Sequence, residues 1–363
     1  MAILASLVRG AGVVLLGTVA LTGAASAQAD FYKDKTIELI ISTGVGGGLD
    51  NNARMVARHL PKFIPGRPTI VAKNMPGAGH VRAANYIYNQ APKDGTTIGT
   101  LIPAFVMAQV LDRTDAIQFD AAKMPWLAST SASNSTVYVW KKTGVNTIDD
   151  AKKKEVLMGG TGAGSYTTLY PLIMNHILGT KFKIVSGYTS TAEVRLAMER
   201  DEVQGRAGNN FNSLKAENAD WLRDNKITIL AQVGLERDSE FNSVPLMIDF
   251  ARNEEERKIL TLFSADVVIG RPFLTAPGVP AERVEILRKA FAAMTKDPDY
   301  LKDSAQAGLD VTLVEGAKIQ KIVEELIQTP PDIVVKAKAA MDPKSLVEKP
   351  KTSEGSKPSE GSK

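Results

Sequence analysis

Two glycine-rich turns, each between a strand-like and a helix-like stretch, restrict most strongly how this chain can fold. The first turn, 42–50 (STGVGGGLD), follows the apolar run 36–41 and precedes a helical pattern. The second turn, 159–168 (GGTGAGSYTT), also follows a short apolar run and leads into a helical pattern. Repeated strand–turn–helix units of this kind are typical of α/β folds with mostly parallel sheets flanked by helices.

The remaining chain continues this alternation. Further strands are expected at 69–72, 97–102, 137–140, 156–158, 182–186, 202–206, 227–233, 266–269 and 309–313. Helices are expected at 51–61, 81–90, 167–178, 191–199, 281–296, 298–307 and 317–327. A second strand series begins near Val137 and has its own glycine-rich turn, so we predict two domains, 28–130 with 235–341 and 131–234. The strand 266–269 lacks a partner in that series and is expected to return to the first sheet.

Both ends of the chain are expected to lie outside the fold. Residues 1–27 contain Arg9, an apolar run and the small residues Ala25, Ser26 and Ala27, which is the layout of a cleaved signal peptide. A single membrane anchor is the alternative, although the apolar run is shorter than the about 20 residues that a helix needs to span a bilayer. Residues 342–363 repeat SEGSK twice and are too polar to offset the entropy of ordering, so a disordered tail is expected.

Composition excludes several classes of function. The chain has no cysteine, which rules out a disulfide scaffold, a thiolate zinc site and cysteine catalysis. Its 44 Lys and Arg against 40 Asp and Glu are scattered, so no nucleic-acid partner is expected. The histidines at 59, 80 and 176 lack metal-ligand spacing, and no carboxylate pair stands out for acid–base catalysis. We therefore expect no metal, no cofactor and no catalytic residue.

The glycine-rich turns have the chemistry of anion sites. Glycines let the backbone approach a ligand, and the N–H groups at the following helix start favour negative charge. Leu49 stands where a dinucleotide motif needs glycine, and the triphosphate motif G-x-x-x-x-G-K-[ST] is absent, whereas a small carboxylate needs neither. Tight turns without any ligand are the alternative. Two such turns, one per predicted domain, suggest a carboxylate held from both sides of a cleft.

The order of these motifs resembles the Bug/TctC-type extracytoplasmic solute receptors of tripartite tricarboxylate transporters. The matching stretches, which together cover about 31–341, are 44–54 (GVGGGLDNNAR), 73–100, 159–168, 184–210, 231–247 and 270–291 (GRPFLTAPGVPAERVEILRKAF). This resemblance implies a two-domain clamshell of the periplasmic-binding-protein type (type II-like), with each domain a mostly parallel sheet flanked by helices. It also implies ligand-binding positions, which carry over to Thr43, Gly46, Gly47, Gly48, Gly164, Ser165, Tyr166, Tyr188, Arg206 and Asn209.

The chain departs from the family pattern at the end of the strand near 203. Many members have Phe-Asp-Asn there, whereas this chain has Gly208 at the acid's position and Asn209 at the amide's. A receptor that binds a ligand amine would need that acidic residue, so an amino acid is the less favoured ligand. Arg206 stands where the family has an apolar residue. It either points into the cleft toward a carboxylate or pairs at the surface with Glu199, Asp201 or Glu202.

These observations favour a periplasmic solute-binding protein over an enzyme. The expected ligand is a small organic acid, either a di- or tricarboxylate or an aromatic carboxylate. The expected partners are the membrane permease subunits of a tripartite tricarboxylate-type transporter, and the receptor is expected to be a monomer. The alternatives are an exported enzyme that uses the same anion-binding cleft and a sensor that presents the ligand to a kinase.

Overall fold

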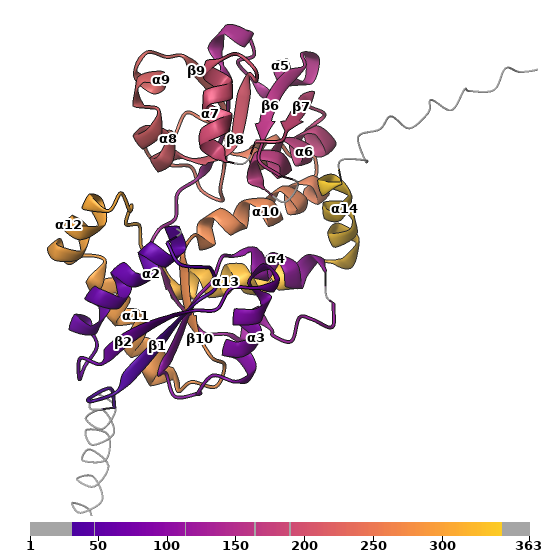
Figure 1. Cartoon of the computed structure of the whole chain (residues 1–363). Helices are drawn as coiled ribbons and strands as arrows, with labels where there is room; N and C mark the ends of the chain where they lie inside the picture. Colours follow the sequence, from indigo (N-terminus) through magenta and orange to yellow (C-terminus); the bar gives the residue numbers. More distant parts are fainter. Residues whose placement is uncertain (1–30, 47, 113, 163–164, 189, 343–363) are drawn as a thin grey trace, which may run out of the picture.

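The strands of the chain form two sheets that lie in two separate lobes (Figure 1). The computed structural model describes residues 31–342 except 47, 113, 163–164 and 189. The first sheet has the order β11-β4-β10-β3-β1-β2 and the second the order β7-β6-β8-β5-β9. The strands are β1 (Thr36–Ile41), β2 (Thr69–Asn74), β3 (Thr97–Thr100), β4 (Trp126–Ser129), β5 (Ser135–Trp140), β6 (Val156–Gly160), β7 (Phe182–Ser186), β8 (Gly205–Asn210), β9 (Ile227–Val233), β10 (Pro272–Thr275) and β11 (Val314–Glu315).

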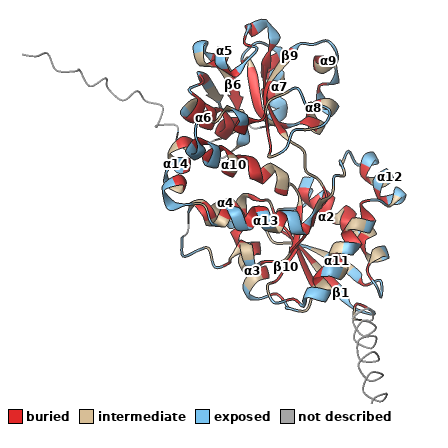
Figure 2. Ribbon diagram, turned by 180° about the vertical axis from the view of Figure 1, so that it is seen from behind, coloured by how far each residue is buried: buried red, intermediate tan, exposed pale blue. Residues whose placement is uncertain are grey.

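Helices flank both sheets, which confirms the predicted α/β class with two lobes. The longer ones are α2 (Gly48–His59), α3 (Val81–Asn89), α4 (Ala104–Leu111), α6 (Tyr166–Leu178), α7 (Thr191–Glu199), α10 (Glu254–Ile269), α11 (Ala281–Met294), α12 (Pro298–Gln306), α13 (Gly316–Ile327) and α14 (Pro331–Met341). The shorter ones are α5 (Ile148–Lys153), α8 (Phe211–Glu217) and α9 (Ala219–Arg223). Buried residues concentrate in the strands and on the helix faces turned toward them (Figure 2).

Both sheets are mixed rather than purely parallel. In the first sheet β1 pairs in parallel with β2 and β3, whereas β10 runs antiparallel to β3 and β4. In the second sheet β6 is parallel to β7 and β8, whereas β5 is antiparallel to β8 and β9. The strands β5 and β10 are the first to follow each crossing between the lobes, so each enters its sheet in the opposite direction.

The chain crosses between the lobes at two places. It leaves the first sheet between β4 and β5 and returns between β9 and β10. The predicted domain boundaries fall within these two stretches and stay a prediction. The helix α10 lies between the lobes, and α14 packs against both α10 and α6 (Figure 1).

The strand predicted at 266–269 is wrong, because these residues are the last turn of α10. That helix begins at Asn253, whose side chain accepts a hydrogen bond from the Glu256 N–H, and ends at Gly270 with a φ of +58°. A short apolar run reads alike in a buried helix and in a buried strand. The strand that returns to the first sheet is β10. The short strand expected at 309–313 is also wrong in its bounds, because these residues are irregular and the strand β11 follows them at Val314–Glu315.

Within the described residues, no helix is long and apolar enough to cross a bilayer. The predicted signal peptide 1–27 lies outside the described residues, as does the predicted tail from residue 343 onward.

Candidate functional site in the cleft between the lobes

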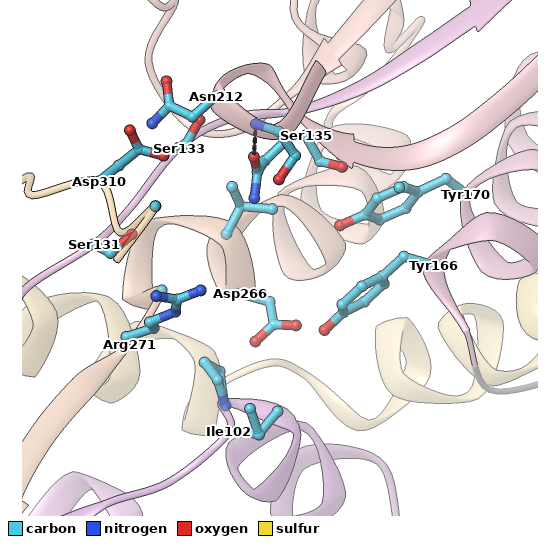
Figure 3. A pocket seen from close by; sticks show the side chains of 17 residues that line it. Ile102, Ser131, Ser133, Ser135, Tyr166, Tyr170, Asn212, Asp266, Arg271 and Asp310 are labelled. Carbon is cyan, nitrogen blue, oxygen red and sulfur yellow. Dashed lines mark hydrogen bonds between the residues drawn. The ribbon is translucent and has the colours of Figure 1, made fainter. Parts of the chain in front are cut away.

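A cavity of about 290 Å³ lies between the two lobes. Its walls come from β5, β8, α6 and α8 of the second lobe, from the loop after β3, from the end of α10 and from the segments near 131–133 and 308–310. The main polar side chains around it are Ser131, Ser133, Ser135, Tyr166, Tyr170, Asn210, Asn212, Asp266, Arg271 and Asp310 (Figure 3).

Arg271 is the cation of this cavity. Gly270 ends α10 with positive φ, and a Cβ there would lie only 2.1 Å from the Ser131 carbonyl oxygen. This close approach lets the Arg271 N–H donate to Ser131 O and to Ser129 Oγ, both at 3.0 Å. Burial lowers the pKa of Arg271, opposed by the charges of Asp310 and Tyr300. Arginine nevertheless stays protonated in proteins.

The guanidinium of Arg271 is available to a ligand. Within the described part of the chain it makes no salt bridge and no hydrogen bond. Its Nη2 also lies near the first glycine-rich turn, since a Cβ built on Gly48 would be 3.3 Å away. A planar fork of donors beside the start of α2 is a favourable place for a carboxylate.

Asp266 is the buried acid of the same cavity. Its side chain is 6 % exposed, and its Oδ1 has no hydrogen-bond partner within the described residues. Burial raises the pKa of Asp266 to about 7. The carboxyl group therefore gains and loses its proton near neutral pH, and it has a free position for a ligand group.

Two tyrosines at the start of α6 form an aromatic wall. The rings of Tyr166 and Tyr170 stack, with centroids 5.1 Å apart and planes at 14°. Ser165 caps this helix by accepting a hydrogen bond from the Thr167 N–H. The Tyr170 hydroxyl is buried and has no hydrogen-bond partner among the residues that the structure describes, and burial raises its pKa.

Gly208 makes room for this wall. Its φ is +76°, and a Cβ there would lie 2.9 Å from the carbonyl carbon and the Cβ of Tyr166. We expect Gly208→Ala to lower the free energy of unfolding by about 2–3 kcal/mol, through backbone strain and overpacking together. Urea denaturation of both proteins measures this difference.

Gly179→Ala is the matched control for that substitution. Gly179 has nearly the same φ, +77°, but no atom lies within 4 Å of a Cβ there. Gly179→Ala should lower the free energy of unfolding only through backbone strain, by about 1 kcal/mol. Equal losses at both positions would contradict a tight contact between Gly208 and Tyr166.

The first glycine-rich turn is organised by Asp50. This buried carboxylate accepts hydrogen bonds from the Gly46 N–H (2.9 Å), Arg54 Nε (3.0 Å) and Asn74 Nδ2 (2.8 Å). Burial opposes ionisation of Asp50, but these hydrogen bonds outweigh it and hold its pKa below the usual value. The Gly46 N–H is therefore engaged by the protein. Asn74 also donates to the Thr43 carbonyl.

The predicted site residues do not all gather at the cavity. Of those that the structure describes, only Tyr166 lines it. Gly48 lies beside Arg271, whereas Thr43 and Gly46 belong to the turn behind it. Ser165 acts as a helix cap. Gly47 and Gly164 lie outside the described residues.

Arg206 does not line the cavity. It is 2 % exposed, its β8 position pairs with Tyr138 of β5, and its Nη1 lies 3.6 Å from Glu217 Oε2. The expected surface partners Glu199, Asp201 and Glu202 are thus replaced by Glu217 of α8. Asn209 is also buried away from the lining, and Tyr188 packs at the edge of the apolar cluster around Tyr138 and Trp221.

Sequence reasoning missed Asp266 and Arg271. Arg271 belongs to the stretch 270–291 that resembles the family, but the resemblance implies no ligand-binding role for it. The signal that could have found it is an arginine placed directly after a glycine and before a buried strand. Asp266 was hidden because its stretch was assigned to a strand.

Two lobes with a polar cleft between them are the arrangement of the two-domain periplasmic-binding-protein fold. A solved TctC solute-binding protein from Polaromonas superposes with a TM-score of 0.65 at 19 % identity, covering 84 % of this chain and 99 % of that one. A protein of R. palustris solved with adipate superposes at 0.53 with 20 % identity, covering 84 % and 97 %. These likenesses show the fold.

The model of the tripartite tricarboxylate transporter family receptor, TctC, matches residues 52–339. The chain therefore belongs to the TctC family, which is a family of transport receptors rather than of enzymes. It is also 24 % identical over 325 residues to the UPF0065 protein in the gbd 5'region of Cupriavidus necator, covering 86 % of this chain and 90 % of the relative.

Proposed function

We propose that this protein captures a small organic acid in the periplasm and delivers it to the membrane subunits of a tripartite tricarboxylate-type transporter. One observation carries the proposal: the Arg271 guanidinium lines the cavity between the lobes and makes no salt bridge or hydrogen bond with the described residues. A charge-assisted, two-pronged hydrogen bond to a carboxylate is the natural use of such a group. The adipate-bound relative supports this ligand class.

Closure of the lobes would couple binding to delivery. We take 28–130 with 235–341 as one domain and 131–234 as the other, with the crossings near 130–134 and 234 as hinges. A ligand held by Arg271 from one side and by the α6 start from the other stabilises the closed form only if it binds that form more tightly. The membrane subunits would then read the closed monomer. The N–H groups around Gly48 are further candidates for ligand contacts, whereas the Ser165 N–H already donates to the Gly162 carbonyl.

A ligand screen tests the proposal. The chain starting at Gln28 is purified and melted with mono-, di- and tricarboxylates, aromatic acids, nucleotides and sugars. A carboxylate at 100 times its dissociation constant is expected to stabilise the fold by about 2.7 kcal/mol. Mass spectrometry of the purified protein should identify any retained acid. Stabilisation by a nucleotide or a sugar, with none by any carboxylate, would contradict the proposal.

A further inference from the structure

We propose that Asp266 and Arg271 are the two poles of the cavity, and that they select a ligand with one carboxylate and, at its other end, a hydrogen-bond donor such as a hydroxyl or ammonium group. This inference rests on the proposed function, because it assigns the ligand class of the same cavity. In Figure 3 the side chains of Arg271, Asp266 and Tyr166 point into the pocket.

The first support is the free acceptor on Asp266. A buried polar atom without a partner costs free energy, and the cost is larger for a charged group. Oδ1 of Asp266 is such an atom, on a side chain that is 6 % exposed and lines the cavity. A ligand N–H or O–H donor placed there would remove that cost. The site therefore favours a ligand that carries such a donor.

The second support is the surrounding field. Asp266 lies in the last turn of α10, where the helix dipole is negative and favours positive charge. The face of the Tyr166 ring, stacked on Tyr170, lies beside Asp266 and can receive an ammonium group (Figure 3). Cation and donor groups are therefore favoured at this end of the cavity.

The third support is the contrast with Arg271. One carboxylate on the ligand is matched by the guanidinium, but a second carboxylate at the other end would have to lie near Asp266. Like charges a few ångströms apart repel strongly where water is largely excluded. A ligand with one acid and one donor avoids this conflict, whereas a dicarboxylate meets it unless a proton is shared.

Two matched ligand series test the proposal by calorimetry at pH 8, where Asp266 is mostly ionised. The four-carbon series is butyrate, 4-hydroxybutyrate, 4-aminobutyrate and succinate. The six-carbon series is hexanoate, 6-hydroxyhexanoate, 6-aminohexanoate and adipate. In at least one series, the hydroxy or amino acid is expected to bind at least tenfold more tightly than both the plain acid and the dicarboxylate.

Two variants separate the kind of donor. Asp266→Asn keeps an acceptor oxygen but removes the charge, so it should abolish a preference for ammonium and keep a preference for hydroxyl. Asp266→Leu should abolish both preferences while the plain acid still binds. Near-ultraviolet circular dichroism and melting check that each variant is folded. If Asp266→Leu does not fold, Asp266→Ala replaces it, because alanine also lacks the acceptor oxygen and should abolish both preferences.

The outcomes separate this inference from the proposed function. Tightest binding of a dicarboxylate, or preferences unchanged in both variants, would overturn the role of Asp266 and leave carboxylate capture standing. Binding of other carboxylates from the wider screen, but of no member of either series, would also overturn it. If no carboxylate binds at all, the proposed function fails together with this inference.

Discussion

Arg271→Ala is expected to weaken binding of the captured carboxylate by roughly 30- to 1,000-fold, or about 2–4 kcal/mol. The guanidinium is the charged donor of the cavity that no described residue pairs with, so its loss leaves the ligand's charge desolvated and unmatched. Isothermal titration calorimetry with the acid found in the screen measures the loss. The fold should persist, because the backbone contacts of Arg271 with Ser129 and Ser131 do not need the side chain.

Two further substitutions sharpen this test. Arg271→Lys should recover part of the affinity, because an ammonium keeps the charge but cannot form the paired donor fork. Arg223→Ala removes an exposed arginine that pairs with Asp224 on the second lobe, and should change the affinity less than twofold. Unchanged affinity in a folded Arg271→Ala protein would show that the carboxylate is held elsewhere.

The second large effect concerns the pH dependence of stability. The pKa of Asp266 is about 7 in the folded protein, against about 3.9 for an unfolded aspartate. Between these values the folded state binds more protons than the unfolded state, so the free energy of unfolding falls as pH rises from 4 to 7. This contribution is about 4 kcal/mol at most, and it levels off above pH 7. The titratable groups that line the cavity together with Asp266 are Tyr166, Tyr170, Arg271 and Asp310.

Asp266→Asn should remove this contribution. Relative to wild type, the ligand-free variant should gain stability steadily from pH 4 to pH 8, as measured by urea denaturation at each pH. Asp220→Asn serves as the surface control, because hydrogen bonding from Lys226 lowers the pKa of Asp220. Relative to wild type, Asp220→Asn should therefore lose stability as pH rises, and the change in its free energy of unfolding should be much smaller. Parallel curves for wild type and Asp266→Asn would mean that Asp266 is not buried as a carboxyl group.

Local sequence patterns predict the supersecondary units well. The runs before both glycine-rich turns are strands, the stretches after them are α2 and α6, and the second strand series forms a sheet of its own. These features depend on residues close together in the chain. The error at 266–269 arises because apolar content alone does not distinguish the end of a buried helix from a strand.

The sequence alone determined the two-lobed α/β fold and the positions of the glycine-rich turns between strand and helix, because periodicity and turn chemistry act over a few residues. Only the tertiary structure decided which polar side chains meet in the cleft. Arg206 lies beside Glu217 of α8 and does not line the cavity, whereas Arg271 and Asp266 reach the cavity from a segment that returns from the other lobe. These groups come together through contacts between residues that are distant in the chain. The local sequence pattern around a residue does not indicate which distant residue it will contact.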